Sequence, residues 1–160
     1  MKTVCFVCTA NISRSPMAEA IFRHRIKQLG LEDQIRVESA GVLARPGYAA
    51  SDHAQAVLAE SGISLEEHAS QVVTLEMLAN FDMFLVMEES HRRSLFYLAP
   101  QHLGKVYLLS EMSGEHYDVE DPYGHSTSRY IETAKQLEGL INGGMASILK
   151  RLGVSIPAAR

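Results

Sequence analysis

Residues 4–16 of the chain read Val4-Cys5-Phe6-Val7-Cys8-Thr9-Ala10-Asn11-Ile12-Ser13-Arg14-Ser15-Pro16. The first four are a short apolar run with β-branched and aromatic side chains, which predicts a buried strand. The polar residues after Val7 predict a tight loop. Pro16 suits the first position of a helix, with Ser15 as its N-cap. A strand, a loop and a helix in this order indicate the first unit of an α/β fold.

Similar units follow along the chain. Residues 35–37, 84–87 and 106–109 are further short apolar runs, and each predicts a strand. Apolar residues recur at helical spacing between these runs, first up to Gly30 and last over 128–152, where Gly143 and Gly144 weaken the pattern. The alternation predicts one three-layer α/β domain over residues 1–160, with a four-stranded parallel sheet and helices on both faces.

Composition narrows the functional classes. The chain has 160 residues, of which 46% are hydrophobic and 21% charged, as in an ordinary globular domain. A net charge of −4 gives no general attraction to nucleic acid, and no apolar run approaches the roughly 18 residues of a membrane span. Two cysteines cannot build a disulfide framework, so we expect a reduced, cytoplasmic location and catalytic cysteine chemistry.

The loop after the first strand suits a phosphate group. In a parallel sheet, ligands bind beyond the carboxyl ends of the strands. Successive backbone N–H groups in a curled loop, next to a helix N-terminus, form an anion-binding cradle. Arg14 at the end of the loop adds a planar set of donors that can hold two phosphate oxygens. The chain lacks the Gly-Lys-Ser/Thr of nucleotide-hydrolysing phosphate loops.

Cys8 lies at the floor of this predicted cradle. The donors that attract phosphate also favour thiolate over thiol, so we expect the pKa of Cys8 to lie well below the free value of about 8.5. Ser15 lies across the loop and can donate a hydrogen bond to the sulfur, which improves it as a leaving group. The alternative is structural: Cys8 as a small buried hydrophobe and Arg14 as a solvated charge.

These residues resemble the low-molecular-weight protein tyrosine phosphatases, whose signature is Cys-x₅-Arg-Ser near the N-terminus and Asp-Pro-aromatic near the C-terminus. Residues 8–15 match the first motif and 121–123 the second, while 38–41, 68–70 and 87–90 resemble landmarks between them. The resemblance covers nearly the whole chain. It implies the family's four-stranded parallel sheet and phosphomonoester hydrolysis through a phosphocysteine, with no metal or cofactor.

Asp121 is the candidate general acid and base. A thiolate that displaces a phenol from phosphorus needs a proton for the departing oxygen, and a carboxylic acid at the mouth of the loop can supply it. The same carboxylate can then take a proton from the water that attacks the phosphocysteine. Pro122 restricts Asp121 to extended conformations. Asp118 and Glu120 are alternatives, and a plain turn is the structural reading.

The resemblance also implies supporting and binding residues. Asn11 is expected to hold the loop through hydrogen bonds with Ser39 and His68. The other histidines do not have the spacing that is typical of metal ligands. We interpret them as ordinary surface or core residues: His24, His53, His91, His102, His116 and His125. The expected substrate contacts on the loop are Thr9, Ala10, Asn11, Ile12, Ser13 and Ser15.

Two positions of the loop depart from the family pattern. Ala10 stands where glycine is usual, and a positive φ there would cost alanine about 1 kcal/mol or more. Ser13 stands where many members have a second cysteine that can trap the oxidised nucleophile. Cys5 cannot replace it, because positions 5 and 8 of a strand point to opposite faces. The spacing of Cys5 and Cys8 is also that of a thioredoxin-type redox pair, but that motif belongs at a helix start, whereas Cys5 lies in the middle of a predicted strand, so a redox role is disfavoured.

The expected substrate is a phosphotyrosine-containing protein or peptide, with inorganic phosphate or vanadate able to occupy the loop. Ile12 can pack on a phenyl ring, and Tyr48 and Tyr123 are candidate walls of the pocket or merely half-buried packing residues. Phosphoarginine phosphatases tend to carry Thr at the position of Ile12, yet residues 39–42 and 121–124 resemble that branch, so protein-arginine phosphatase activity is the alternative. Arsenate reduction and non-catalytic phosphate binding are less favoured.

Overall fold

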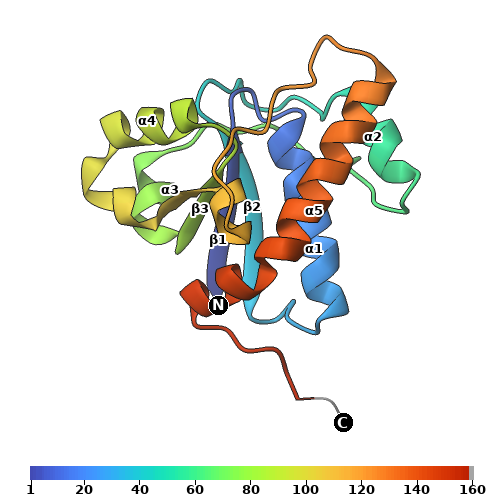
Figure 1. The fold of residues 1–160 in the computed structure, drawn as a ribbon. Coiled ribbons are helices and arrows are strands. Elements are labelled where there is room, and N and C mark those ends of the chain that lie inside the picture. The colour runs from blue at the N-terminus through green and yellow to red at the C-terminus, as the bar shows by residue number, and fades with distance from the viewer. Residues whose placement is uncertain (159–160) are drawn as a thin grey trace.

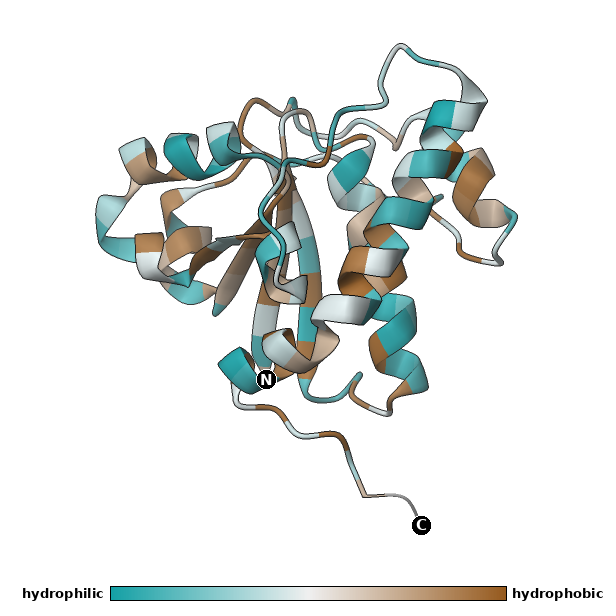
Figure 2. Cartoon of the chain, in the orientation of Figure 1, coloured by the Kyte–Doolittle hydropathy of each residue, from teal (hydrophilic) through white to brown (hydrophobic). Residues whose placement is uncertain are grey.

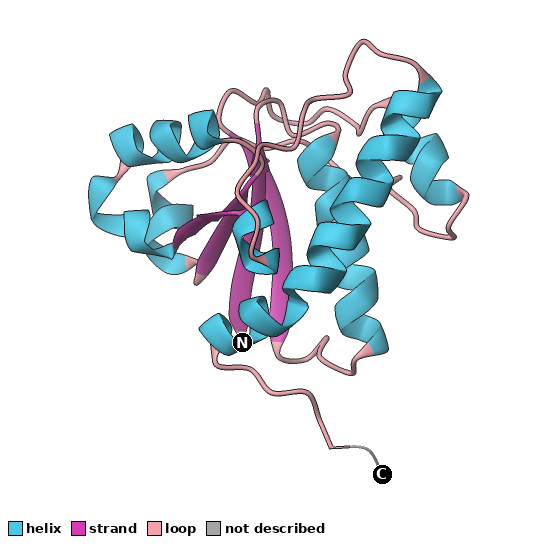
Figure 3. Cartoon of the chain, in the orientation of Figure 1, coloured by secondary structure: helices cyan, strands magenta, loops and turns pink. Residues whose placement is uncertain are grey.

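The computed structural model of the protein describes residues 1–158. A parallel sheet of four strands lies at its centre, in the order β2-β1-β3-β4 (Figure 3). The strands are β1 (Lys2–Cys8), β2 (Ile35–Gly41), β3 (Met83–Val86) and β4 (Val106–Leu108). The predicted four-stranded parallel sheet is therefore confirmed. The strands β1 and β2 are longer than the apolar runs 4–7 and 35–37, because their backbones stay paired as far as Cys8 and Gly41.

Helices cover both faces of the sheet (Figure 1). The helices α1 (Arg14–Gln28) and α5 (Thr127–Leu152) lie on one face, with α2 (Asp52–Ala59) against α5, while α3 (Leu75–Asn80) and α4 (Glu89–Leu98) lie on the other. Two 3₁₀ helices, η1 (Pro100–Lys105) and η2 (Leu109–Ser113), flank β4. This is the three-layer α/β arrangement that the sequence predicts.

The alternation of side chains along β1 builds two cores. Val4, Phe6 and Cys8 belong to the larger core under α1 and α5, whereas Cys5 and Val7 belong to the smaller core under α3 and α4. A strand buried on both faces needs apolar residues at every position, which is why residues 4–7 form a continuous apolar run. The predicted separation of Cys5 and Cys8 onto opposite faces is confirmed.

The helix α5 is continuous through Gly143 and Gly144, where the sequence predicts a weak point. Hydrophobic and hydrophilic residues alternate along it (Figure 2). A Cβ added at Gly144 would lie 2.7 Å from the Cβ of Met112. Glycine therefore lets η2 approach the helix closely, and this packing offsets the roughly 1 kcal/mol by which glycine disfavours a helix.

The start of α1 differs from the prediction. The helix begins at Arg14, with Ser13 rather than Ser15 at the N-cap, and the Ser13 carbonyl accepts a hydrogen bond from Met17 N at 3.1 Å. Pro16 remains in the first turn, where its missing N–H costs no intrahelical bond. The side chain of Ser15 is used in the loop instead of capping the helix. None of the helices within residues 1–158 has the length and apolarity to cross a membrane.

Candidate active site

The loop between β1 and α1 lies against the end of β2. A Cβ on Gly41 would come within 2.5 Å of the Thr9 carbonyl oxygen and 3.0 Å of Asn11 N. Only glycine leaves room for so close an approach of two backbones. Backbone hydrogen bonds also join the start of the loop to the segment after β2: Val42 N donates to Cys8 O at 3.0 Å, and Leu43 N donates to Thr9 O at 2.9 Å.

Asn11 is the residue in the left-handed conformation, with φ of 58°, and it is the one non-glycine residue of positive φ within the described residues 1–158. Ala10 therefore carries no such strain, and the glycine usual at that position is not needed for a positive φ here. Asparagine is among the residues that tolerate this region best, because its side chain bonds locally.

The side chain and carbonyl of Asn11 tie the loop to its surroundings. Its amide Nδ2 donates to Ser15 Oγ at 2.8 Å and to Ser39 Oγ at 3.0 Å, and its Oδ1 accepts from Gln71 N at 3.0 Å. His68 Nε2 donates to the Asn11 carbonyl at 2.7 Å. The contacts expected with Ser39 and His68 are thus both present.

Cys8 has its sulfur 2.9 Å from Ser15 Oγ, and only 3% of the residue is exposed. The Asn11 amide donates to that hydroxyl oxygen, which leaves the hydroxyl proton of Ser15 for an acceptor. The sulfur is the nearer acceptor, since the Ala40 carbonyl lies 3.5 Å away. A hydrogen bond from Ser15 stabilises the anionic form of a thiol. Cys5 differs: burial raises the pKa of its thiol well above the ordinary value, with the Glu38 and Glu19 carboxylates adding to the effect.

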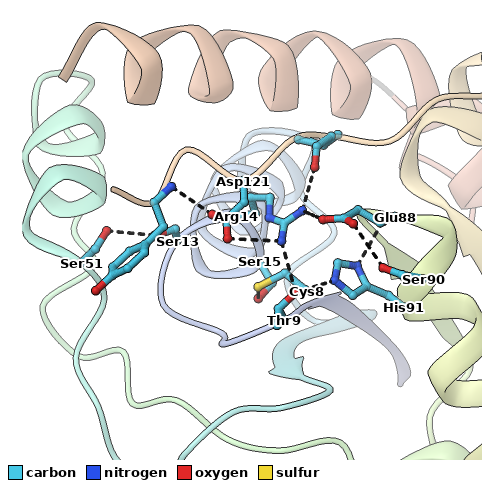
Figure 4. Close-up of polar contacts among 12 residues, drawn as sticks. Cys8, Thr9, Ser13, Arg14, Ser15, Ser51, Glu88, Ser90, His91 and Asp121 are labelled. Carbon is cyan, nitrogen blue, oxygen red and sulfur yellow. Dashed lines mark hydrogen bonds and ion pairs between the residues drawn. The ribbon is translucent and has the colours of Figure 1, made fainter. Parts of the chain in front are cut away.

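Arg14 is 1% exposed, and its guanidinium is aimed at the loop (Figure 4). Its Nη1 donates to the Glu88 carboxylate and, at 2.8 Å, to the carbonyl of Val119. Its Nη2 lies 3.4 Å from Thr9 Oγ1 and 3.6 Å from Asp121 Oδ2. A buried guanidinium needs such partners, and they hold its plane in a fixed orientation.

Asp121 reaches the site from the segment before α5. Its Oδ1 accepts from Tyr123 N at 3.0 Å, and about half of its side chain is exposed. Its two acidic neighbours are engaged elsewhere. Glu120 pairs with Arg129 at 2.8 Å, and Asp118 accepts from Glu89 N at 3.0 Å. Of the three carboxylates, Asp121 is the one that the structure places in an ion pair with Arg14.

This arrangement agrees with comparisons against known proteins. The sequence model of the low molecular weight phosphotyrosine protein phosphatases matches residues 3–153. The chain belongs to this family. A Bacillus subtilis protein-arginine-phosphatase is 39% identical over 86% of this chain and 91% of its own length, and a Streptomyces coelicolor low-molecular-weight protein-tyrosine-phosphatase is 35% identical over 93% and 94%. The crystal structure of a low-molecular-weight protein tyrosine phosphatase from T. tengcongensis is 40% identical, covers 92% of this chain and 99% of its own, and superposes with a TM-score of 0.86.

Family membership confirms the expected enzyme class, a cysteine-dependent low-molecular-weight protein-tyrosine phosphatase, and the expected fold. Within the described residues 1–158, no three His, Cys, Asp or Glu side chains are grouped so that they could hold a metal ion.

The remaining predicted residues lie around the loop. Ile12 is partly buried, and its carbonyl accepts from Ser51 N at 2.8 Å. Ser13 is buried, and its hydroxyl contacts Ser51 Oγ at 3.1 Å and Tyr130 OH at 3.2 Å. These two contacts tie the Ser13 side chain to neighbouring segments of the protein. Tyr48 and Tyr123 are 56% and 62% exposed, so neither is the half-buried packing residue considered as the alternative.

Two residues of the site escape the sequence reasoning. Glu88 binds Arg14. His91, expected as an ordinary surface or core residue, is 1% exposed, and its Nε2 lies 2.9 Å from Thr9 Oγ1. The two residues are three apart at the start of α4, where Glu88 N donates to His91 Nδ1 at 3.1 Å and His91 N donates to the Glu88 carbonyl at 3.0 Å. Burial alone would raise the pKa of Glu88, but the hydrogen bond and charge of Arg14 outweigh it and lower the pKa.

His91 makes stability depend on pH. Burial and the charge of Arg14 lower its pKa from 6.5 to about 4. Between these values the unfolded chain binds more protons than the folded one, so the free energy of unfolding falls as pH drops from 6.5 towards 4, by up to about 3 kcal/mol from this residue. Urea unfolding of wild type and His91→Asn across this range measures it. We expect a flatter pH dependence in His91→Asn, and equal slopes would contradict the assignment.

Proposed function

We propose that the protein hydrolyses phosphotyrosine in proteins through a covalent phosphocysteine on Cys8. One observation carries the proposal: Cys8, Arg14 and Asp121 border the same loop. The Cys8 sulfur lies 2.9 Å from Ser15 Oγ, while Arg14 Nη2 lies 3.4 Å from Thr9 Oγ1 and 3.6 Å from Asp121 Oδ2. A phosphate monoester in the loop would have its non-bridging oxygens held by backbone N–H groups and by Arg14.

The first step transfers the phosphoryl group. The Cys8 thiolate attacks phosphorus, an S–P bond forms as the bond from phosphorus to the tyrosine oxygen breaks, and Asp121 in its acid form gives its proton to the leaving oxygen. Arg14 and the loop amides stabilise the charge that builds on the equatorial oxygens. Glu88 and the Val119 carbonyl keep the guanidinium plane in position during this step.

The second step returns the enzyme to its starting state. Asp121, now a carboxylate, takes a proton from water as the water oxygen bonds to phosphorus and the S–P bond breaks. Cys8 leaves as a thiolate that the Ser15 hydroxyl stabilises at 2.9 Å. Inorganic phosphate is the product, and phosphate or vanadate should occupy the same loop. The chain's own residues supply the nucleophile, the acid and base, and the groups that bind phosphate.

We place the protein in the cytoplasm because Cys5 and Cys8 are both free thiols.

A second candidate substrate is phosphoarginine, because the Bacillus subtilis relative that is 39% identical is named a protein-arginine-phosphatase. Ile12 is the residue that favours phosphotyrosine. Its branched apolar side chain can contact a phenyl ring but offers no hydrogen bond to a guanidinium, whose buried donors would then lack partners.

Ile12→Thr is expected to shift this preference. The ratio of kcat/KM for a phosphotyrosine peptide to that for the matching phosphoarginine peptide should fall by about tenfold or more, because a threonine hydroxyl suits the polar leaving group and removes apolar contact with the ring. Ile12→Leu is the matched control and should keep the wild-type ratio. An unchanged ratio in Ile12→Thr would show that Ile12 does not contact the leaving group.

A further inference from the structure

His91 lies in the first turn of α4 and reaches across to the phosphate loop. Its Nδ1 accepts a hydrogen bond from Glu88 N at 3.1 Å, and its Nε2 lies 2.9 Å from Thr9 Oγ1 (Figure 4). A backbone N–H can only donate, so Nδ1 carries no proton. Both ring nitrogens therefore have a partner: Nδ1 contacts the first turn of α4, and Nε2 contacts Thr9, the residue after Cys8.

The charge state of the ring decides whether Nδ1 is free to accept from Glu88 N. The charges that face it come from α1, from its own turn and from the segment before α5: Arg14, Glu88, Asp118 and Asp121. Burial and Arg14 outweigh the three carboxylates and keep the pKa at about 4. The ring is therefore neutral at pH 7, and its single proton lies on Nε2 and is donated to Thr9 Oγ1.

The Thr9 hydroxyl then has two donors aimed at it. Arg14 Nη2 donates to Thr9 Oγ1 at 3.4 Å in addition to His91 Nε2. A hydroxyl oxygen has two lone pairs and one proton, so with both lone pairs engaged its proton must go to a further acceptor. Within residues 1–158 the Thr9 hydroxyl has His91 and Arg14 as its partners, and both are donors. That acceptor can come from outside the chain, for example a bound phosphate oxygen.

We propose that the Thr9 hydroxyl donates a hydrogen bond to a non-bridging oxygen of the phosphoryl group bound in the loop, and that His91 is the positioning residue that turns the hydroxyl proton toward it. The inference rests on the proposed function of the loop. It assigns the loop a side-chain donor in addition to its backbone amides and Arg14, and it connects α4 on the far face of the sheet to the reaction.

The chain offers matched variants for the test. Thr9→Val keeps the shape of the side chain and removes the hydroxyl, while Thr9→Ser keeps the hydroxyl. In His91→Asn the new amide oxygen can still accept from Glu88 N, but the side chain is too short to reach Thr9. In His91→Gln the longer side chain can place its amide nitrogen where the imidazole Nε2 lies. Ser94→Ala, at an exposed hydroxyl on α4, controls for changes to the helix itself.

We expect Thr9→Val to lower kcat/KM for para-nitrophenyl phosphate by about 100-fold, the lower end of the range for losing one donor to developing charge. Its dissociation constant for inorganic phosphate, measured by calorimetric titration, should rise by about tenfold. His91→Asn should show a smaller loss in the same two quantities, while Thr9→Ser and His91→Gln should recover most of it. The double variant Thr9→Val with His91→Asn should be no slower than Thr9→Val alone, because His91 acts through the hydroxyl.

Wild-type values in Thr9→Val, or losses that multiply in the double variant, would overturn the inference. The titration with phosphate keeps this outcome separate from the proposed function. A wild-type chain that fails to release phenol in a Cys8-dependent step contradicts the proposed reaction, whereas equal phosphate affinities in wild type and Thr9→Val contradict the role of the Thr9 hydroxyl alone.

Discussion

Replacing Cys8 by serine is expected to lower the turnover of para-nitrophenyl phosphate by roughly four to six orders of magnitude, the usual result of removing a nucleophile. The proposed reaction needs a thiolate, and a serine hydroxyl stays protonated at neutral pH without an adjacent base. Rapid mixing should show a burst of phenol in wild type and none in Cys8→Ser.

Cys5→Ala is the matched control for this prediction. Cys5 is the other free thiol, and it lies on the opposite face of the sheet in the core under α3 and α4. Its buried thiol has a raised pKa, so it stays protonated and should contribute nothing to the burst. A Cys8→Ser variant with wild-type turnover would remove the covalent mechanism. A wild type that binds vanadate but shows no burst would make the protein a phosphate-binding module.

Replacing Asp121 by asparagine is expected to lower kcat by about 10²- to 10⁴-fold, the range for loss of a general acid and base. The loss should be greatest for substrates with poorly acidic leaving groups, because these depend most on a proton from Asp121. Steady-state kinetics on a series of aryl phosphates of different leaving-group acidity measures both effects.

The neighbouring carboxylates are the controls for Asp121. Glu120→Gln should leave kcat within a few-fold of wild type, because Glu120 is paired with Arg129. Asp118→Asn should also have a small effect, since Asp118 accepts a backbone hydrogen bond from Glu89. If Asp121→Asn retained full activity while Glu120→Gln lost it, the assignment of the acid would move to Glu120.

The sequence predicted well what depends on local pattern. The apolar run 4–7 and the polar loop after it are enough to indicate the strand, the turn and the helix, because β1 is buried on both faces and all four of these residues are apolar. The motif of Cys8 to Ser15 and the Asp-Pro at 121–122 indicated the family and the chemistry, since each residue type is needed for its role.

What the sequence did not predict depends on contacts between distant segments. The start of α1 at Arg14 reflects the use of Ser15 by Cys8 and Asn11, which draws that side chain away from a capping role. His91 reads as an ordinary histidine until α4 places it 2.9 Å from Thr9. The continuity of α5 at Gly144 likewise depends on Met112, which is far away in the chain.

The most direct test of the mechanism is to trap the phosphoryl group on the enzyme. With para-nitrophenyl phosphate the leaving group departs with little help from an acid, whereas hydrolysis of the intermediate still needs Asp121 as a base, so Asp121→Asn should accumulate the phosphocysteine. Acid quenching followed by mass spectrometry of the peptides is expected to find one phosphoryl group on the peptide that holds Cys8. Release of phenol with no phosphoryl group on Cys8, or with the group on another residue, would contradict the account.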